Sequence, residues 1–473
     1  MSSSTFSTIK IPVLPSLDTP IQNCHKLADR SILLGAPSSI MASTNRSQIH
    51  ECGNDHVCTI IPDYLLQRIV DNENAHPDAR KSAERSLYHT ARLRASRAAV
   101  STTLAGHGNA PRPMQSIIGP HLFQAIIDSD TASDADKERA RKNLVLTQSL
   151  RATREGAAPA GGAVREDLNR AIYDCKQAPN LPGELIRSEG DPAIQDKNGD
   201  EVYDYFQNTL DFYFLALKRD SIDDQGFNLI GSIHYDDDQP PTGYDNAFWN
   251  GKQMVFGDGD GIMFGSFTKS LDVIGHELTH GVTQFTASLP YHQQSGALNE
   301  SISDVFGSMV KQYTLKQTAD EADWLIGKEL LMPDILAQGN LALRSMREPG
   351  KAFKNTPFGD DTQPGHMRDY QNLPDDPAND AGGVHINSGI PNHAFFLVAT
   401  ALGGSSWERA GPIWYATLLD KKLRDYANAP DGVNFASCFP FFAELTCTHA
   451  LELFGSDVQA TVRKAWVDVG VLR

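Results

Sequence analysis

The chain has 473 residues, of which 40% are hydrophobic and 21% charged, a balance typical of a folded protein with two or three domains. No apolar run reaches the roughly 18 residues of a membrane span, which excludes an integral membrane protein. The net charge of −17 argues against nucleic acid as a partner, because a polyanion requires a basic surface.

The N-terminal residues 1–50 are rich in Ser, Thr, Pro and Ile without periodicity, which predicts an irregular tail. They lack a basic segment followed by an apolar one, so no secretory signal is recognised. We therefore expect a cytoplasmic protein or one secreted by an unconventional route. Six scattered cysteines without a CxxC pair favour reduced thiols, with a disulfide between Cys438 and Cys447 as the alternative.

Residues 51–154 contain an internal repeat. The segment 58–97 aligns without gaps on 115–154, and both copies share a pair of isoleucines, a Leu-x-Gln pattern and the tripeptide LRA. Each copy is predicted to form a short extended segment, a helix and a longer amphipathic helix with a basic end. Units of about 40 residues are small for independent folds, so we expect them to pack on a larger domain.

The Gly/Ala/Pro-rich stretch 155–163 is the predicted domain boundary and, as an exposed linker, a site for proteolysis. Residues 1–160 carry 18 Lys and Arg against 15 Asp and Glu, whereas the remainder carries 24 against 44. A slightly basic front and a strongly acidic back would attract each other.

The rest of the chain predicts two lobes of an α+β fold. Residues 164–285 contain strand-like runs rich in turn signals, interrupted by a helical pattern over 203–219. From about residue 270, helical patterns dominate through 286–473. A β-rich lobe followed by a mainly α-helical one favours a cleft between them.

The segment LDVIGHELTHGVTQF (271–285) carries the most informative pattern. His276 and His280 are four residues apart, so on a helix both imidazoles project from one face and reach a single ion. Glu277 lies beside the first histidine, where a carboxylate can take a proton from a metal-bound water. Alone, the five-residue pattern also occurs in helices whose two histidines are merely exposed.

The segment GALNESISDVFG (296–307) adds two acidic residues. Catalytic zinc sites use three protein ligands and keep one position for water. Glu300, with 19 residues between it and His280, can supply the third ligand from a following helix. Asp304 lies one helical turn further on the same face and can accept the second N–H of a ligand histidine.

These segments, with YDNAFWNGKQMVFGDGDG (244–261) and DAGGVHINSG (380–389), resemble the thermolysin-like neutral metallopeptidases over roughly residues 165–473. CTIIPDYLL (58–66) is similar to a propeptide segment of the protealysin-type branch, whose precursors carry short propeptides. The resemblance implies a two-lobed zinc endopeptidase made as a zymogen. It also implies one zinc bound by His276, His280 and Glu300, with Glu277 as general base and proton shuttle.

The resemblance further implies that Tyr291 and His385 donate hydrogen bonds to the oxyanion, while Asp380 orients His385. Donors aimed at developing charge in a dry site contribute several kcal/mol. Taken singly, each residue could equally be structural.

Substrate contacts are implied in the same way. Arg344 would bond the carbonyl of the residue after the scissile bond, and Asn246 and the backbone of Ala247 would hold the substrate strand and leaving amine. Five apolar residues would line the pocket that follows the scissile bond, or else belong to the core, and they predict cleavage before Leu, Phe or Ile: Phe264, Phe267, Val273, Ile326 and Leu343.

The chain departs from the family at the double calcium site. It has Lys311, Leu325 and Lys328 where better-known members have carboxylates, and an ammonium cannot ligate calcium. Asp272 and Asp323 remain, so we predict that Lys311 pairs with them and that calcium contributes little.

The duplicated front is a second departure, because the propeptide unit appears twice. We hypothesise that one copy covers the cleft and the other is scaffold or a second cover. Cys58 could block the zinc as a thiolate, but a buried structural cysteine is the favoured interpretation, since its counterpart is Gln115.

Two other functions share the zinc ligands. A catalytically silent zinc-binding protein would act through partners, but it need not retain Glu277, His385 and Tyr291 together. A zinc aminopeptidase would require an acidic anchor for the substrate amine, and none is recognised. We expect peptide or protein substrates, the chain's own N-terminal region as a partner in cis, no nucleic acid or membrane, and a monomer.

Overall fold

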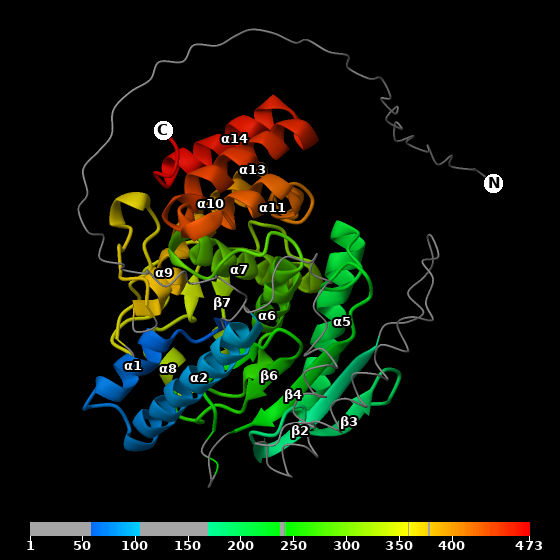
Figure 1. Ribbon diagram of the computed structural model, residues 1–473, viewed down its shortest axis with the longest axis vertical. Helices are drawn as coiled ribbons and strands as arrows, with labels where there is room; N and C mark the ends of the chain where they lie inside the picture. The colour runs from blue at the N-terminus through cyan, green and yellow to red at the C-terminus, as the bar shows by residue number, and fades with distance from the viewer. Residues whose placement is uncertain (1–57, 105–168, 237–240, 242, 358, 377–378) are drawn as a thin grey trace, which may run out of the picture. The chain divides into compact units, whose positions relative to one another are not determined.

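The computed structural model describes residues 58–104, 169–236, 241, 243–357, 359–376 and 379–473. It has a β-sheet lobe followed by a helical region, which confirms the predicted α+β class (Figure 1). The irregular tail, the second repeat copy and the linker 155–163 lie outside the described residues, so the predictions about them stand as predictions. Among the described helices, none is long and apolar enough to cross a membrane.

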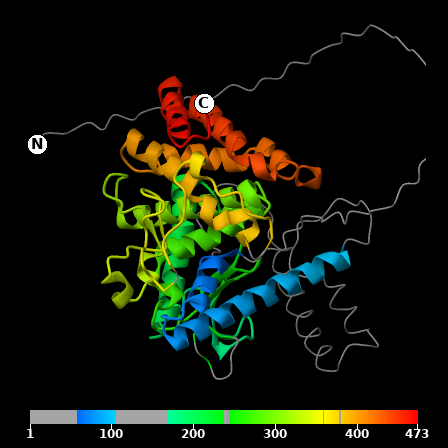
Figure 2. The same ribbon diagram turned by 90° about the vertical axis from the view of Figure 1, so that its left-hand side faces the viewer.

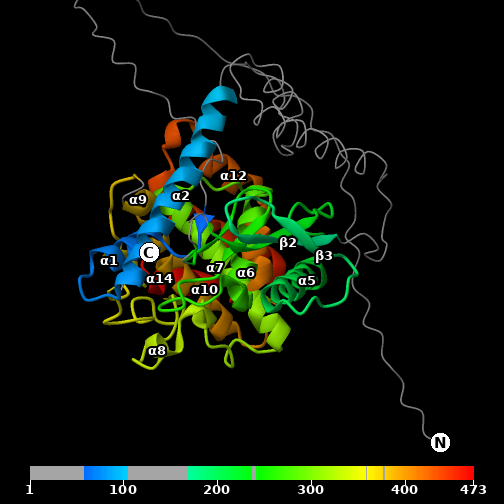
Figure 3. The ribbon, with the colours of Figure 1, turned by 90° about the horizontal axis from the view of Figure 1, so that it is seen from below.

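The sheet of the first lobe has the strand order β1-β5-β6-β4-β2-β3 within the described residues. Alternating and continuous apolar runs bury its inner face against α5 (Lys197–Leu217), which Figure 3 shows beside β2 and β3. The strands are β1 (Cys58–Thr59), β2 (Arg170–Ala178), β3 (Glu184–Ser188), β4 (Leu229–Tyr235), β5 (Ala247–Trp249) and β6 (Met254–Gly257).

Helix α5 begins at Lys197, six residues before the predicted start at 203. The cause is a cap: the Asp196 carboxylate accepts hydrogen bonds from the backbone N–H groups of Asn198 and Gly199. The added residues include the buried Val202, whose side chain lies beside Gly231 of β4.

Two buried helices form the centre of the molecule, α6 (Leu271–Gln284) and α7 (Gln293–Leu315). Gly307 explains how closely they approach, since a Cβ there would lie 2.4 Å from the Asp272 carbonyl oxygen on α6. This close packing sets the distance between the side chains that the two helices present to each other.

The C-terminal part of the chain is mainly helical, and its last helices lie together in Figure 1. The prediction of helix from about 270 onward holds for most of it, but the described residues between 318 and 376 are largely irregular, with the short pair β7 (Leu325–Ile326) and β8 (Arg344–Ser345). The helices are α8 (Pro333–Leu336), α9 (Asp380–Asn387), α10 (Gly389–Leu402), α11 (Ala410–Leu419), α12 (Lys421–Ala427), α13 (Cys438–Phe454) and α14 (Ser456–Asp468). Cys438 and Cys447 are buried free thiols in α13.

The N-terminal segment, residues 58–104, has the predicted order of an extended piece and two helices, α1 (Asp63–Asp71) and α2 (Pro77–Leu104). Its β1 and α1 lie against the rest of the chain in Figures 1 and 2, and β1 pairs antiparallel with the sheet edge β5. Ile60, Ile61 and Leu66 are fully buried in the same core as residues of α6 and α7.

Candidate metal centre

The two helices α6 and α7 bring the three predicted ligands together. His276 and His280 project from the same face of α6, and Glu300 projects from α7 toward them. All three side chains are buried, and their ligand atoms lie within 4.8 Å of one another. Within the described residues this is the group of His, Cys, Asp and Glu with metal-binding geometry.

The distances match a small tetrahedral ion. The two Nε2 atoms are 3.0 Å apart, Glu300 Oε2 is 3.4 Å from His276 Nε2, and Glu300 Oε1 is 3.5 Å from His280 Nε2. A tetrahedral zinc with bonds of about 2.0–2.1 Å separates its ligand atoms by roughly 3.3 Å. The residues present therefore fit zinc.

A second layer of partners fixes which nitrogen of each histidine faces the centre. His276 Nδ1 is 2.8 Å from Asp304 Oδ1, as the spacing on α7 predicted. His280 Nδ1 lies 2.9 Å from Asn299 Oδ1 and 3.0 Å from Ser303 Oγ, two partners that the sequence analysis missed. Asn299 and Ser303 are four residues apart on α7, so their shared helix face was the signal available.

Burial and neighbouring charges shift the pKa values of the three predicted ligands. Burial lowers the pKa of His280 to about 4, so this imidazole is neutral. Burial also acts against charge on His276, but the hydrogen bond to Asp304 and the negative charges of Asp304 and Glu300 outweigh it and raise the pKa to about 9. Burial raises the pKa of Glu300, but the neighbouring histidines, His385 first and then His280 and His276, hold it well below its ordinary value. A cation at the centre would displace the His276 proton and meet two neutral imidazoles and a carboxylate.

Glu277 is fully buried beside the ligands. Its Oε2 accepts a hydrogen bond from the backbone N–H of Trp249 in β5, 3.0 Å away, while its Oε1 has no hydrogen-bond partner. Burial raises the pKa of Glu277 to about 8. Glu300 Oε2 is the second buried carboxylate oxygen of this group without a hydrogen-bond partner, and two such oxygens fit a bound cation with a water.

His385 and Asp380 form a compact pair in α9. Asp380 accepts from the His385 backbone N–H at 2.8 Å and lies 2.6 Å from His385 Nδ1. Gly382 and Gly383 make this possible, because the chain turns between them at φ of 84° and 76°. The opposite ring nitrogen, His385 Nε2, is 3.0 Å from the Tyr291 hydroxyl, which also donates to Glu300.

Arg344 contacts both Asp304, the partner of the predicted ligand His276, and the N-terminal segment. Its guanidinium makes a bidentate ion pair with Asp304, at 2.8 and 2.7 Å, and donates through Nη1 to the Ile60 carbonyl at 3.1 Å. Asn392 of α10 donates to Asp304 as well, at 2.8 Å, and was missed by the sequence analysis. The ion pair holds the pKa of Asp304 at about 2 against the effect of burial.

Asn246 and Ala247, at the start of β5, contact the same segment. Asn246 Oδ1 accepts from the Ile61 N–H at 2.9 Å, and its Nδ2 donates to the Ile61 carbonyl at 3.0 Å. The Ala247 carbonyl accepts from the Ile60 N–H at 3.3 Å. The predicted apolar pocket residues are all buried in the core cluster that contains Ile60: Phe264, Phe267, Val273, Ile326 and Leu343.

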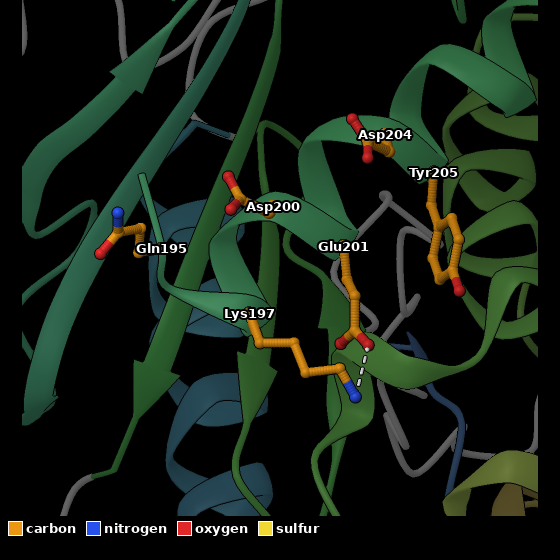
Figure 4. Close-up of a pocket in the computed structure, with 6 residues that line it drawn as sticks. All are labelled: Gln195, Lys197, Asp200, Glu201, Asp204 and Tyr205. Carbon is orange, nitrogen blue, oxygen red and sulfur yellow. Dashed lines mark ion pairs between the residues drawn. The ribbon is translucent and has the colours of Figure 1, made fainter. Parts of the chain in front are cut away.

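A polar pocket of about 410 Å³ lies elsewhere, at the start of α5 (Figure 4). Lys197 and Glu201 form an ion pair at 3.4 Å within it. None of its lining residues belongs to the metal group or contacts the N-terminal segment, so it is separate from the chemistry described above. The other residues that line it are Gln195, Asp200, Asp204 and Tyr205.

Comparison with protein families matches two models. Residues 155–284 match the thermolysin metallopeptidase catalytic domain, and residues 287–471 match the thermolysin metallopeptidase alpha-helical domain. Together they cover more than half of the chain.

Individual relatives match more of the chain than the two family models together. The chain is 48% identical to the extracellular metalloprotease of Pectobacterium carotovorum subsp. carotovorum, over 76% of this chain and 97% of that one. It is 46% identical to protease PrtS of Photorhabdus sp. strain Az29, over 75% of this chain and 91% of that one. The solved precursor of protealysin, a metalloproteinase from Serratia proteamaculans, matches with a TM-score of 0.59 and 46% identity, over 76% of this chain and 99% of that chain.

Proposed function

The chain belongs to the thermolysin metallopeptidase family and is a zinc-dependent endopeptidase, and we propose that it cleaves peptide bonds before large hydrophobic residues with Glu277 as general base. The single observation that carries the proposal is the buried group His276, His280 and Glu300 with the unpartnered Glu277 Oε1 beside it. The alternative, a catalytically silent zinc-binding protein, is not favoured, because the relatives are themselves named as proteases.

Different residues of the chain have separate roles in the proposed hydrolysis. Zinc, when bound, supplies a Lewis acid that polarises the scissile carbonyl and lowers the pKa of water. Glu277 takes the proton of the attacking water and passes it to the leaving amine, since Oε1 is free while Oε2 is fixed by Trp249. His385 and Tyr291 donate to the oxyanion, and Asp380 keeps His385 Nε2 aimed at it.

Specificity is proposed to come from the five apolar residues near β7. They are buried together with Ile60, whose carbonyl and N–H meet Arg344 and Ala247. A charged side chain placed there would lose its hydration without a partner. Cleavage before Leu, Phe or Ile follows.

The decisive experiment uses protein whose linker has been cut by a protease of another catalytic class. We expect it to hydrolyse a peptide at the bond before a single internal leucine, to lose this activity with a zinc chelator and to regain it with zinc. A matched peptide with Asp in place of Leu should remain intact. Release of N-terminal amino acids alone would indicate an aminopeptidase, and zinc binding without hydrolysis would indicate the silent protein.

We also propose that the N-terminal segment inhibits the uncut chain. Its helix α2 presents Ser82 and Ser86 to Asp245, a fully buried carboxylate whose pKa burial raises well above its ordinary value. Ser82 Oγ donates to Asp245 Oδ2 at 2.6 Å, and Ser86 Oγ accepts from the Asp245 backbone N–H at 3.0 Å. Covering β5 with β1 and α2 would keep substrates away from the metal centre.

Removing one of these hydrogen bonds should weaken the inhibition. Ser82→Ala leaves Asp245 Oδ2 buried without its donor, at a cost of about 1–3 kcal/mol. We expect the peptide-hydrolysis rate of the uncut chain to rise roughly tenfold, since about 1.4 kcal/mol corresponds to a factor of ten. Glu84→Ala, at an exposed position of the same helix, serves as the matched control. Equal rates for both variants would argue against the docking role of Ser82.

A further inference from the structure

The backbone around residues 59–61 lies along β5 as a bound substrate would. Thr59 pairs with Phe248 and Cys58 with Trp249 in an antiparallel ladder, which Ile60 continues through its N–H to the Ala247 carbonyl. Thr59, Ile60 and Ile61 are fully buried. A strand added to an exposed sheet edge is a common mode of peptide recognition.

Two contacts enclose a single peptide bond. His385 Nε2, the proposed oxyanion donor, lies 2.9 Å from the Thr59 carbonyl oxygen. Arg344 Nη1, proposed to bond the carbonyl of the residue after the scissile bond, donates to the Ile60 carbonyl at 3.1 Å. The bond between these two carbonyl-bearing residues is Thr59–Ile60, and the residue that follows it is the hydrophobic one that the proposed specificity requires.

The proposed general base, Glu277, and the proposed acceptor for the leaving amine, Ala247, lie beside the same strand. Glu277 Oε2 is hydrogen-bonded to the N–H of Trp249, which is the residue paired with Cys58. The proposed general base therefore lies beside the β1–β5 ladder, at the residue paired with Cys58, one position before Thr59. The Ile60 N–H already points to Ala247, the acceptor proposed for the leaving amine.

We propose that Thr59–Ile60 is a self-cleavage site, cut by the catalytic residues of the same molecule before the linker is cut. This inference rests on the proposed function. Water adds its hydroxyl to the Thr59 carbonyl carbon and a proton to the Ile60 nitrogen as the C–N bond breaks. The products are a carboxylate at Thr59 and an α-ammonium at Ile60, and no other reactant is required.

The cut is intramolecular, because the bond is inaccessible to a second molecule. Both residues have no exposed surface, and the strand that carries them is covered by the core. Cutting by another copy would require the N-terminal segment to leave β5 first.

The first cut leaves the inhibitor in place. The contacts of Arg344, Asn246 and Ala247 all go to Ile60 and Ile61, on the C-terminal side of the bond. Further contacts from α1 and α2 also remain, including Arg68 Nη1 to the Asp360 carbonyl at 2.9 Å. Loss of residues 1–59 should therefore precede activity, which appears only after a second cut frees the segment.

The test follows full-length protein by intact mass after it is purified with a chelator and then given zinc. We expect a fragment that ends at Thr59 and a chain that begins at Ile60, formed with a first-order rate constant unchanged over a hundredfold dilution. Peptide hydrolysis should not rise during this phase. Glu277→Gln protein should stay intact at this bond even when mixed with wild-type protein. A rate that falls with dilution, or cutting of the Glu277→Gln chain, would overturn the cis mechanism.

The repeat provides a matched pair of variants, because Ser116–Ile117 is the equivalent bond of the second copy. Ile60→Asp should abolish the cut, and Ile117→Asp should leave its rate within twofold. Cutting at Ser116–Ile117 instead would refute the assignment. Hydrolysis of the leucine peptide without either cut would refute the inference alone, whereas failure to hydrolyse any peptide would refute the proposed function as well.

Discussion

We expect Glu277→Gln to lower kcat for the leucine peptide by about 10²–10⁴-fold, the range of a lost general base. The amide keeps the size of the carboxylate, and its carbonyl oxygen can still accept from the Trp249 N–H. It cannot take a proton from water, so the geometry is retained and the chemistry is lost. The measurement is kcat on protein cut externally at the linker, since this variant should not mature itself.

Zinc content decides whether the loss is chemical. Glu277 is not a member of the His276, His280 and Glu300 group, so metal analysis should give one zinc per chain in the variant as in the wild type. Glu452→Gln, which changes an exposed carboxylate on α13, should leave kcat unaltered. A zinc-loaded Glu277→Gln enzyme that keeps a tenth of wild-type activity would exclude the general-base role.

The metal ligands could be predicted because their arrangement is mostly local. His276 and His280 share a face by helical periodicity, and the same rule placed Asp304 one turn from Glu300. The partners of His280 were harder to predict. Asn299 and Ser303 acquire their role only when α7 packs against α6 at a distance set by Gly307, and no local pattern encodes that distance.

Contacts between distant parts of the chain were the least predictable. Asn392 reaches Asp304 across 88 residues, and the Ile60 carbonyl meets Arg344 across 284. The repeat indicated that the N-terminal segment packs on something larger, but not that β1 would extend the sheet beside β5. Strand pairing of this kind depends on which edge is left open, which follows from the whole fold.

Two of the three carboxylate partners of Lys311 were predicted from the sequence. Its Nζ lies 3.0 Å from Asp272 and 3.8 Å from Asp323, the two carboxylates predicted as partners. A third carboxylate, Glu329, lies 3.3 Å away and was not predicted, because it enters from the short 3₁₀ helix Lys328–Leu330 after β7. The three negative charges hold the pKa of the Lys311 ammonium above its ordinary value despite burial.

We expect Lys311→Met to destabilise the protein by about 3–5 kcal/mol, the cost of leaving a buried charge without its partner. Asp272 is fully buried, and the hydrogen bond from Ser270 at 2.5 Å cannot replace the lost ammonium. The measurement is the urea midpoint of unfolding, read by fluorescence. Lys311→Arg keeps the positive charge and should lose less than half as much stability.

Calcium provides the complementary measurement, because the ammonium lies among the carboxylates that a cation would require. Lys311 Nζ is within 4.0 Å of Asp272, Asp323 and Glu329, so an incoming ion would have to displace it and be repelled by it. We therefore expect millimolar calcium to leave the Tm of the wild-type protein unchanged within a degree. A rise of several degrees would show that the ion pair does not substitute for calcium at this position. Such a rise together with a neutral Lys311→Met variant would place the stabilising interaction elsewhere in the chain.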